Sequence, residues 1–423
     1  MWSEAASAQV RAAVSGTRGP WGVTAQLLGA QLVLAAVSLI VNVIAARTMG
    51  PSGRGSLAVF LQVSYILATC CGAGLNRSYP AAIHGRPVMG TALLDQRRLL
   101  FAPLAVVAAT ILLASLLGPG EGLLPLAYGI ALTLTVFGNV LMTTLRTASV
   151  AARTARTYLL LVVAGQVVLL LFATAFLLAS VDSAAAWLGA YALALTVPSI
   201  ITWLIVGRRG DPTGSAPAVT QSARRIGLRL LPAALANIAM LRIDRLLLPA
   251  LAGVSQLGLY VVVAAITELI AWPVQNYVEA RVPQWRRALL TGSLPVGRLF
   301  GAVGLYAVVA AVAISLLGRW SVIPLFGEAY RQSLDLVVPL AVAAALYAAS
   351  RLGHALAISA HLSGWVTAID TVGMISAILA YLILIPPLGA SGAAIGCLVG
   401  YGACLLVSLG VIPALRRPRI GAH

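Results

Sequence analysis

The sequence predicts an all-helical protein that crosses a membrane many times, and two observations support this fold class. Of the 423 residues, 60% are hydrophobic and only 9% are charged, with a mean hydropathy of +0.97. The apolar residues are gathered into twelve runs of about 20 residues, the length that an α-helix needs to cross the hydrocarbon core. We therefore expect about twelve transmembrane helices.

The twelve expected spans divide equally between the two halves of the chain. The first six cover residues 21–46, 56–75, 99–117, 123–145, 158–180 and 184–206. The last six cover residues 230–250, 258–278, 299–317, 336–358, 365–385 and 389–415.

The basic residues predict an orientation for these spans. All 28 residues counted as lysine or arginine are arginines, and most lie in or beside every second gap between spans. Loops that face the cytoplasm carry such an excess of positive charge. We expect both termini inside the cell, and attribute the net charge of +17 to topology and anionic lipid rather than nucleic acid. Abundant Ala, Arg and Gly without lysine is typical of a high-GC bacterial genome, which indicates a plasma membrane.

A sequence repeat relates the two halves of the chain. Residues 50–55 after the first span and residues 253–258 after the seventh share the pattern G-x-S-x-x-G. A second, shorter match aligns Ala152-Arg153 with Ala360-His361, and the two members of this match are separated by nearly the same number of residues as those of the first. We therefore expect two homologous six-helix bundles.

The repeat also predicts the domain organisation: a tail (1–20), an N-lobe (21–206), a cytoplasmic linker (207–229), a C-lobe (230–415) and a basic tail (416–423). Each lobe has an even number of spans, so both have the same orientation and their pseudo-two-fold axis runs along the membrane normal. A cavity between two such lobes that opens alternately to either side is the arrangement of a transporter.

Four short segments, spread over nearly the whole chain, carry a family resemblance. They are Ala46-Arg47-Thr48-Met49-Gly50-Pro51, Gly72-Ala73-Gly74-Leu75-Asn76, Asp244-Arg245-Leu246-Leu247-Leu248 with Gly258-Leu259-Tyr260, and the stretch 385–394 (IPPLGASGAA). With these segments the chain resembles the MOP (multidrug/oligosaccharidyl-lipid/polysaccharide) exporter superfamily, and within it the Wzx-like polysaccharide and O-antigen flippases.

This resemblance implies a MATE-like fold of twelve helices in two six-helix bundles. It also implies a lipid-diphosphate-linked oligosaccharide as substrate, moved from the inner to the outer leaflet for cell-surface polysaccharide biosynthesis. Membrane lipids and polysaccharide assembly enzymes are the partners it implies. The chain departs from the lipid II flippases in having no room for two additional helices.

A diphosphate headgroup needs fixed cationic donors, and the planar guanidinium of arginine pairs bidentately with phosphate oxygens. Arg242 and Arg245 are three residues apart and therefore lie on one face of the seventh span. Arg245 lies about 8 Å in from the outer end, at about 1.5 Å per residue. We interpret both as part of a headgroup site; the alternative is that they pair with Asp244 and Glu268 or snorkel to the surface. Arg77 is a second candidate phosphate contact.

Glu268 is the deepest carboxylate of the chain, about 15 Å into the eighth span. Such a group could bind and release a proton and so couple ion movement to transport. It could instead be the counter-charge of Arg242 or Arg245 when no substrate is bound. Asp244 is a further candidate for ion coupling, or a structural partner of Arg245.

Other polar side chains could line the same cavity and meet sugar hydroxyls, although hydrogen bonds between helices would also explain them. They are Gln26, Gln31 and Asn42 on the first span and Gln62, Tyr65 and Asn76 on the second. Asp370 in the eleventh span is expected to pair with Arg351, His354 or His361.

The sequence gives little support for catalysis, so we expect no enzyme, catalytic residue, metal ligand or cofactor. Without lysine there is no G-x-x-x-x-G-K nucleotide-binding loop. The four cysteines lie within apolar runs and are expected to pack in the core. A membrane glycosyltransferase or polymerase would need a larger outer segment than residues 318–335. A cation-coupled multidrug exporter of the same superfamily is the main alternative, although the intramembrane charges lean slightly basic.

Overall fold

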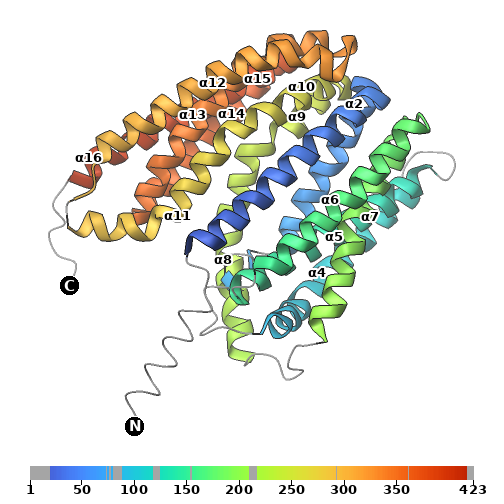
Figure 1. The fold of residues 1–423 in the computed structure, drawn as a ribbon, viewed down its shortest axis with the longest axis horizontal. Coiled ribbons are helices and arrows are strands. Elements are labelled where there is room, and N and C mark those ends of the chain that lie inside the picture. Colours follow the sequence, from blue (N-terminus) through green and yellow to red (C-terminus); the bar gives the residue numbers. More distant parts are fainter. Residues whose placement is uncertain are drawn as a thin grey trace. The chain divides into compact units, whose positions relative to one another are not determined.

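A computed structural model describes residues 20–72, 74–75, 78–79, 88–117, 124–152, 155–208, 217–291, 293–360 and 362–416. Every regular element within these ranges is a helix (Figure 1). The predicted all-helical fold class is therefore confirmed, and each of the twelve expected spans overlaps at least one helix.

The helices of the first half begin with α2 (Pro20–Gly72), which covers the first two expected spans and is interrupted at Gly50. The next four are α4 (Met89–Leu117), α5 (Leu124–Ala152), α6 (Ala155–Leu178) and α7 (Ala184–Gly207). The second half contains α8 (Pro217–Arg242), α9 (Asp244–Ala252), α10 (Val254–Thr267), η1 (Glu268–Ile270), α11 (Ala271–Leu290), α12 (Val296–Phe326), η2 (Glu328–Ser333), α13 (Leu334–Ser359), α14 (Ser363–Leu388), α15 (Ala390–Leu409) and α16 (Val411–Arg416).

Nine helices among the described residues are long and apolar enough to cross a membrane, or up to ten if α4, which bends by 52°, counts as one span. Apart from α4, the difference from twelve arises at two places. The first two expected spans are joined in α2, and the seventh is divided between α8 and α9, where its charged residues lie.

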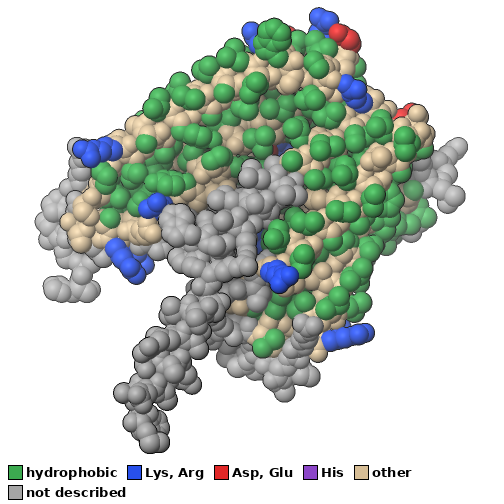
Figure 2. Space-filling view, viewed as in Figure 1, with side chains coloured by type: hydrophobic (Ala, Val, Ile, Leu, Met, Phe, Trp, Pro, Cys, Tyr) green, Lys and Arg blue, Asp and Glu red, His purple; other side chains and the backbone are tan. Residues whose placement is uncertain are grey.

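The outer faces of these helices are apolar. Figure 2 shows hydrophobic side chains over the visible helix faces and charged side chains in only a few places. On α12, more than half of each of six large side chains is exposed: Leu305, Val308, Val309, Val312, Leu316 and Leu317. Apolar surface on this scale fits hydrocarbon rather than water. The chain is a multi-pass membrane protein.

The helices group into two compact units. One contains residues 1–41, 71–174 and 189–229, and the other contains residues 42–70, 175–188 and 230–423, insofar as these are described. The lobe boundaries expected from the repeat stay a prediction.

In the first unit, small residues let α5, α6 and α7 approach one another closely. A Cβ added at Gly138 of α5 would meet Thr196 of α7, and one added at Gly165 of α6 would meet the carbonyl of Ala194. The Thr196 hydroxyl donates to the Leu134 carbonyl at 2.9 Å, which joins α5 to α7. Close helix approach and such hydroxyl bonds are the means by which helices associate in lipid.

In the second unit, α13 is the central helix. Its buried alanines, among them Ala341, Ala345 and Ala348, pack in one core with residues of α11, α12 and α15. Glycines bring α14 and α15 together in the same way, because a Cβ at Gly400 would meet Ala377. Within each unit, small residues thus allow the helices to pack closely.

The repeated glycine motif has the same structure in both halves. Gly50 (φ 65°, ψ −176°) and Gly253 (φ 91°, ψ 159°) each join two helices with a positive φ that favours glycine. The helices that follow then cross reciprocally. A Cβ at Gly55 would meet the Val254 carbonyl, and a Cβ at Gly258 would meet the Pro51 carbonyl. The sixth residue of each motif thus lies against the second residue of the other motif, as expected when two motifs are related by a pseudo-two-fold axis.

We predict that Gly55→Ala and Gly258→Ala each lower the unfolding temperature in detergent, since the added methyl group would force two backbones apart at a cost of about 1–3 kcal/mol. Gly301→Ala is the matched control, because nothing lies within 4 Å of a Cβ there. Alanine at that helical position should leave stability unchanged or raise it by up to about 1 kcal/mol. Equal stability of Gly258→Ala and the native chain would contradict the close crossing.

Candidate functional site

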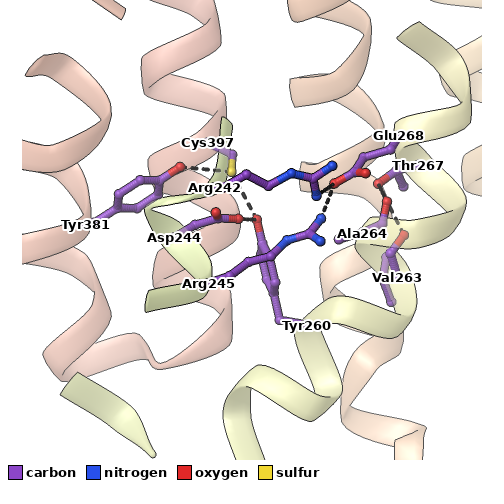
Figure 3. Close-up of polar contacts among 10 residues, drawn as sticks. All are labelled: Arg242, Asp244, Arg245, Tyr260, Val263, Ala264, Thr267, Glu268, Tyr381 and Cys397. Carbon is purple, nitrogen blue, oxygen red and sulfur yellow. Dashed lines mark hydrogen bonds and ion pairs between the residues drawn. The ribbon is translucent and has the colours of Figure 1, made fainter. Parts of the chain in front are cut away.

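Arg242, Arg245 and Glu268 form one ion cluster (Figure 3). Nη1 of Arg242 lies 3.1 Å from Oε1 of Glu268, and Nη2 of Arg245 donates to the same oxygen. The side chains are 29%, 17% and 37% exposed, in that order, so the cluster is accessible from outside the protein core. The two arginines share one face, as their spacing predicts, and Glu268 is the counter-charge of both.

Two irregular helical turns lie next to these side chains. α8 and α9 meet at a turn at Ile243, and α10 passes into the 3₁₀ helix Glu268–Ile270 before α11. Pro273 accounts for the second break, because its ring clashes with the carbonyl four residues earlier and supplies no N–H to it. In α9, Pro249 likewise has no N–H to donate to the carbonyl of Arg245, four residues earlier. Interrupted helices are where membrane proteins place polar sites.

The cluster holds more cationic donors than its carboxylate uses. Two guanidinium groups face one carboxylate, which leaves a formal excess of positive charge. Each guanidinium carries several N–H donors, and Nε of Arg245 has no partner among the described residues. An anion with several oxygen atoms would therefore find donors already in place.

Asp244 belongs to a separate buried polar chain that joins α9, α10, α15 and α14 (Figure 3). The Tyr260 hydroxyl donates to Oδ2 of Asp244 at 2.6 Å and lies 3.1 Å from the Cys397 sulfur, which lies 3.1 Å from the Tyr381 hydroxyl. All four residues are at most 4% exposed. Oδ1 of Asp244 has no partner among the described residues, and Asp244 forms no ion pair with its neighbour Arg245 there.

Three of the other predicted site residues, Asn42, Gln62 and Tyr65, have side chains that the structure describes. Asn42 accepts a hydrogen bond from Nη2 of Arg54. Gln62 is buried, its Nε2 has no partner in the described part of the chain, and Tyr65 is exposed. Within the described part of the chain, neither Gln62 nor Tyr65 forms a hydrogen bond with the ion cluster. Outside the described residues lie Asn76, Arg77 and the side chains of Gln26 and Gln31.

Sequence analysis missed Arg54. We expected the second span to begin at residue 56, which would place this arginine in a loop, whereas the helix resumes at Pro51 and buries Arg54. Proline is favoured at the first position of a helix, so Pro51 was the available signal. Tyr260, Cys397 and Tyr381 were also missed, because they lie within apolar runs and no local spacing connects them.

A second ion cluster joins α13 to α14. Nη2 of Arg351 lies 3.0 Å from Oδ1 of Asp370, and Nε2 of His354 lies 3.2 Å from Oδ2. The Arg351 guanidinium also stands over the Tyr347 ring at 5.1 Å. The expected pairing of Asp370 is therefore confirmed.

Comparison with known proteins shows the fold. A multidrug resistance MATE family transporter of the MOP superfamily, in an inward-facing conformation, matches with a TM-score of 0.67 at 16% identity over 91% of this chain and 96% of that one. The lipid II flippase MurJ, in an inward closed conformation, matches with a TM-score of 0.67 at 9% identity over 91% and 86%. A eukaryotic MATE transporter matches with a TM-score of 0.54 at 14% identity over 94% and 96%.

This chain thus has the fold of the MOP transporters. Its structural neighbours are transporters and flippases rather than enzymes. No family model and no curated protein sequence matches the chain.

The buried polar chain allows a stability prediction. A double-mutant cycle with Asp244→Asn and Tyr260→Phe should give a coupling energy of about 1.5 kcal/mol, because the hydroxyl donates to a buried carboxylate. Chemical unfolding in detergent micelles measures it. Tyr260→Phe combined with Asp335→Asn, an exposed carboxylate, is the control and should be additive. Additive effects for the Asp244 and Tyr260 pair would contradict the hydrogen bond.

Proposed function

We propose that this protein is an alternating-access flippase that moves a polyprenyl-diphosphate-linked oligosaccharide, or a related anionic glycolipid, to the outer leaflet of a bacterial plasma membrane. The convergence of Arg242 and Arg245 on one carboxylate among apolar helices supports the proposal most strongly. In this role the protein would resemble the Wzx-like flippases and supply cell-surface polysaccharide assembly.

Glu268 would act as the resident anion of the headgroup site. Without substrate, it prevents two guanidinium groups from facing apolar surroundings unpaired, which would be costly. An incoming diphosphate offers more acceptor oxygens than a carboxylate and would displace Glu268 from both arginines. When the headgroup leaves on the other side, Glu268 would pair with the arginines again and reset the site.

The comparisons are compatible with a lipid substrate, since one neighbour of the same fold is described as a lipid II flippase. The apolar helix faces suit the rest of the proposal. A polyprenyl tail could remain in the bilayer beside exposed aliphatic side chains, such as those of α12, while only the headgroup enters the protein.

A cation-coupled multidrug exporter is the second candidate, and the buried polar chain favours it. Oδ1 of Asp244 has no partner among the described residues, and the Tyr260 hydroxyl donates to the other oxygen of the carboxylate. A carboxylate oxygen without a hydrogen-bond donor suits a cation. Several neighbours of the same fold are described as MATE transporters, one of them as a multidrug resistance protein.

Transport in proteoliposomes tests the first candidate. We predict that Arg242→Ala/Arg245→Ala lowers outward movement of a fluorescent undecaprenyl-diphosphate saccharide by at least about tenfold, because two charge-assisted contacts are lost. Arg319→Ala/Arg331→Ala removes two exposed arginines and should transport normally. Equal insertion of all three proteins is verified first.

Normal transport by the Arg242→Ala/Arg245→Ala variant would make those arginines structural. No transport by the native protein, together with export of a cationic dye that Asp244→Asn abolishes, would favour the multidrug exporter.

The resident-anion role of Glu268 predicts a binding difference. Glu268→Gln should bind pyrophosphate, as a headgroup probe, about tenfold more tightly than the native protein, since the anion no longer has to displace a carboxylate. The shift in unfolding temperature with pyrophosphate measures this. Glu328→Gln, which breaks the exposed pair with Arg331, should behave like the native protein. Equal shifts in all three proteins would argue against displacement.

A further inference from the structure

An apolar groove in the first unit shares no residue with either ion cluster. It has a volume of about 340 Å³ and is formed by α4, α5 and α7. Its walls include Leu100, Phe101, Phe137, Val140 and Leu204. The groove lies at the bend of α4, which turns by 52° between residues 97 and 100. Its volume is in the range of small-ligand sites in proteins.

Arg97 is the one charged side chain among the residues that line the groove. Thr144 also lines it, but its hydroxyl donates to the Val140 carbonyl at 2.7 Å and is thereby satisfied. Arg97 is exposed, and none of the ion pairs within the described residues involves it. A single cation therefore stands beside an apolar groove.

Trp203 lines the same groove. Tryptophan is enriched where membrane proteins pass from the hydrocarbon core to the headgroup region, because its ring is apolar and its N–H is polar. Arginines near a membrane surface attract anionic headgroups. Together these two side chains indicate a site for a molecule whose chain is apolar and whose head is negatively charged.

We propose that this groove binds an anionic glycerophospholipid of the surrounding bilayer, with an acyl chain between α4, α5 and α7 and its phosphate on Arg97. Charge complementarity identifies the occupant, because a lipid with a net negative head neutralises the unpaired guanidinium and a zwitterionic lipid does not. Besides Arg97, the residues that line the groove offer only the indole N–H of Trp203 as a further donor, which is too few for the many hydroxyls of a saccharide headgroup. The inference requires only that the chain spans a membrane.

Tryptophan fluorescence tests the proposal, because bromine atoms on a lipid chain quench a nearby indole. The full-length protein is reconstituted with brominated phosphatidylglycerol or brominated phosphatidylcholine. The contribution of Trp203 is obtained from the difference between the native protein and Trp203→Phe. Trp320, which is 83% exposed on α12, reports on bulk lipid through Trp320→Phe.

We expect the anionic lipid to be preferred at Trp203 by about fivefold, the contribution of one arginine near the membrane surface. Trp320 follows the exposed Arg319, so it should show no preference once Arg319→Gln has removed that charge. Arg97→Gln should abolish the preference at Trp203, whereas Arg97→Lys, which keeps the charge, and Arg319→Gln, which removes an exposed arginine elsewhere, should retain it.

Three results would overturn the proposal. Equal quenching of Trp203 by both lipids would show that the groove does not select charge. A preference that persists in Arg97→Gln would show that Arg97 does not hold the headgroup. Displacement of the brominated lipid by undecaprenyl phosphate but not by unbrominated phosphatidylglycerol would assign the groove to a polyprenyl chain instead.

Discussion

Two arginines can face each other among apolar helices because Glu268 lies between them. An arginine in hydrocarbon costs about 3 kcal/mol even on the most favourable scale, and two adjacent ones also repel each other. Oε1 of Glu268 contacts both Arg242 and Arg245, so only one positive charge is left to be solvated. The local structure has to hold this carboxylate within reach of both guanidinium groups. The same arrangement leaves unused donors, and it is these donors that suit the site to an anion.

Several features hold Glu268 in this position. α10 is fixed at its start by the reciprocal glycine crossing, since Gly258 lies ten residues before Glu268 and touches the Pro51 carbonyl region. Farther along, the Tyr260 hydroxyl ties α10 to Asp244 on α9, the helix that carries Arg245. Glu268 keeps helical dihedral angles and donates its backbone N–H to the Ala264 carbonyl, so the helical backbone itself sets where its side chain points. A repeat motif, a buried hydrogen bond and the helical backbone thus act together to position this side chain.

Much of the fold could be predicted because its signals are local. Apolar runs predict the helices, and spacing in a helix predicts that Arg242 and Arg245 share a face. The partner of Asp244 could not be predicted, because its contacts join helices far apart in sequence, and apolar helices give no pattern that specifies how they pack. Arg54 was expected in a loop because only a single residue, Pro51, signals that the helix already resumes before it.

The central claim is that a diphosphate replaces Glu268 on the two arginines. The most direct measurement is an experimental structure of the protein with a bound polyprenyl diphosphate. Our account predicts phosphate oxygens within about 3 Å of both guanidinium groups, with the Glu268 carboxylate moved away from them. A diphosphate bound elsewhere, while Glu268 keeps both ion pairs, would contradict the account.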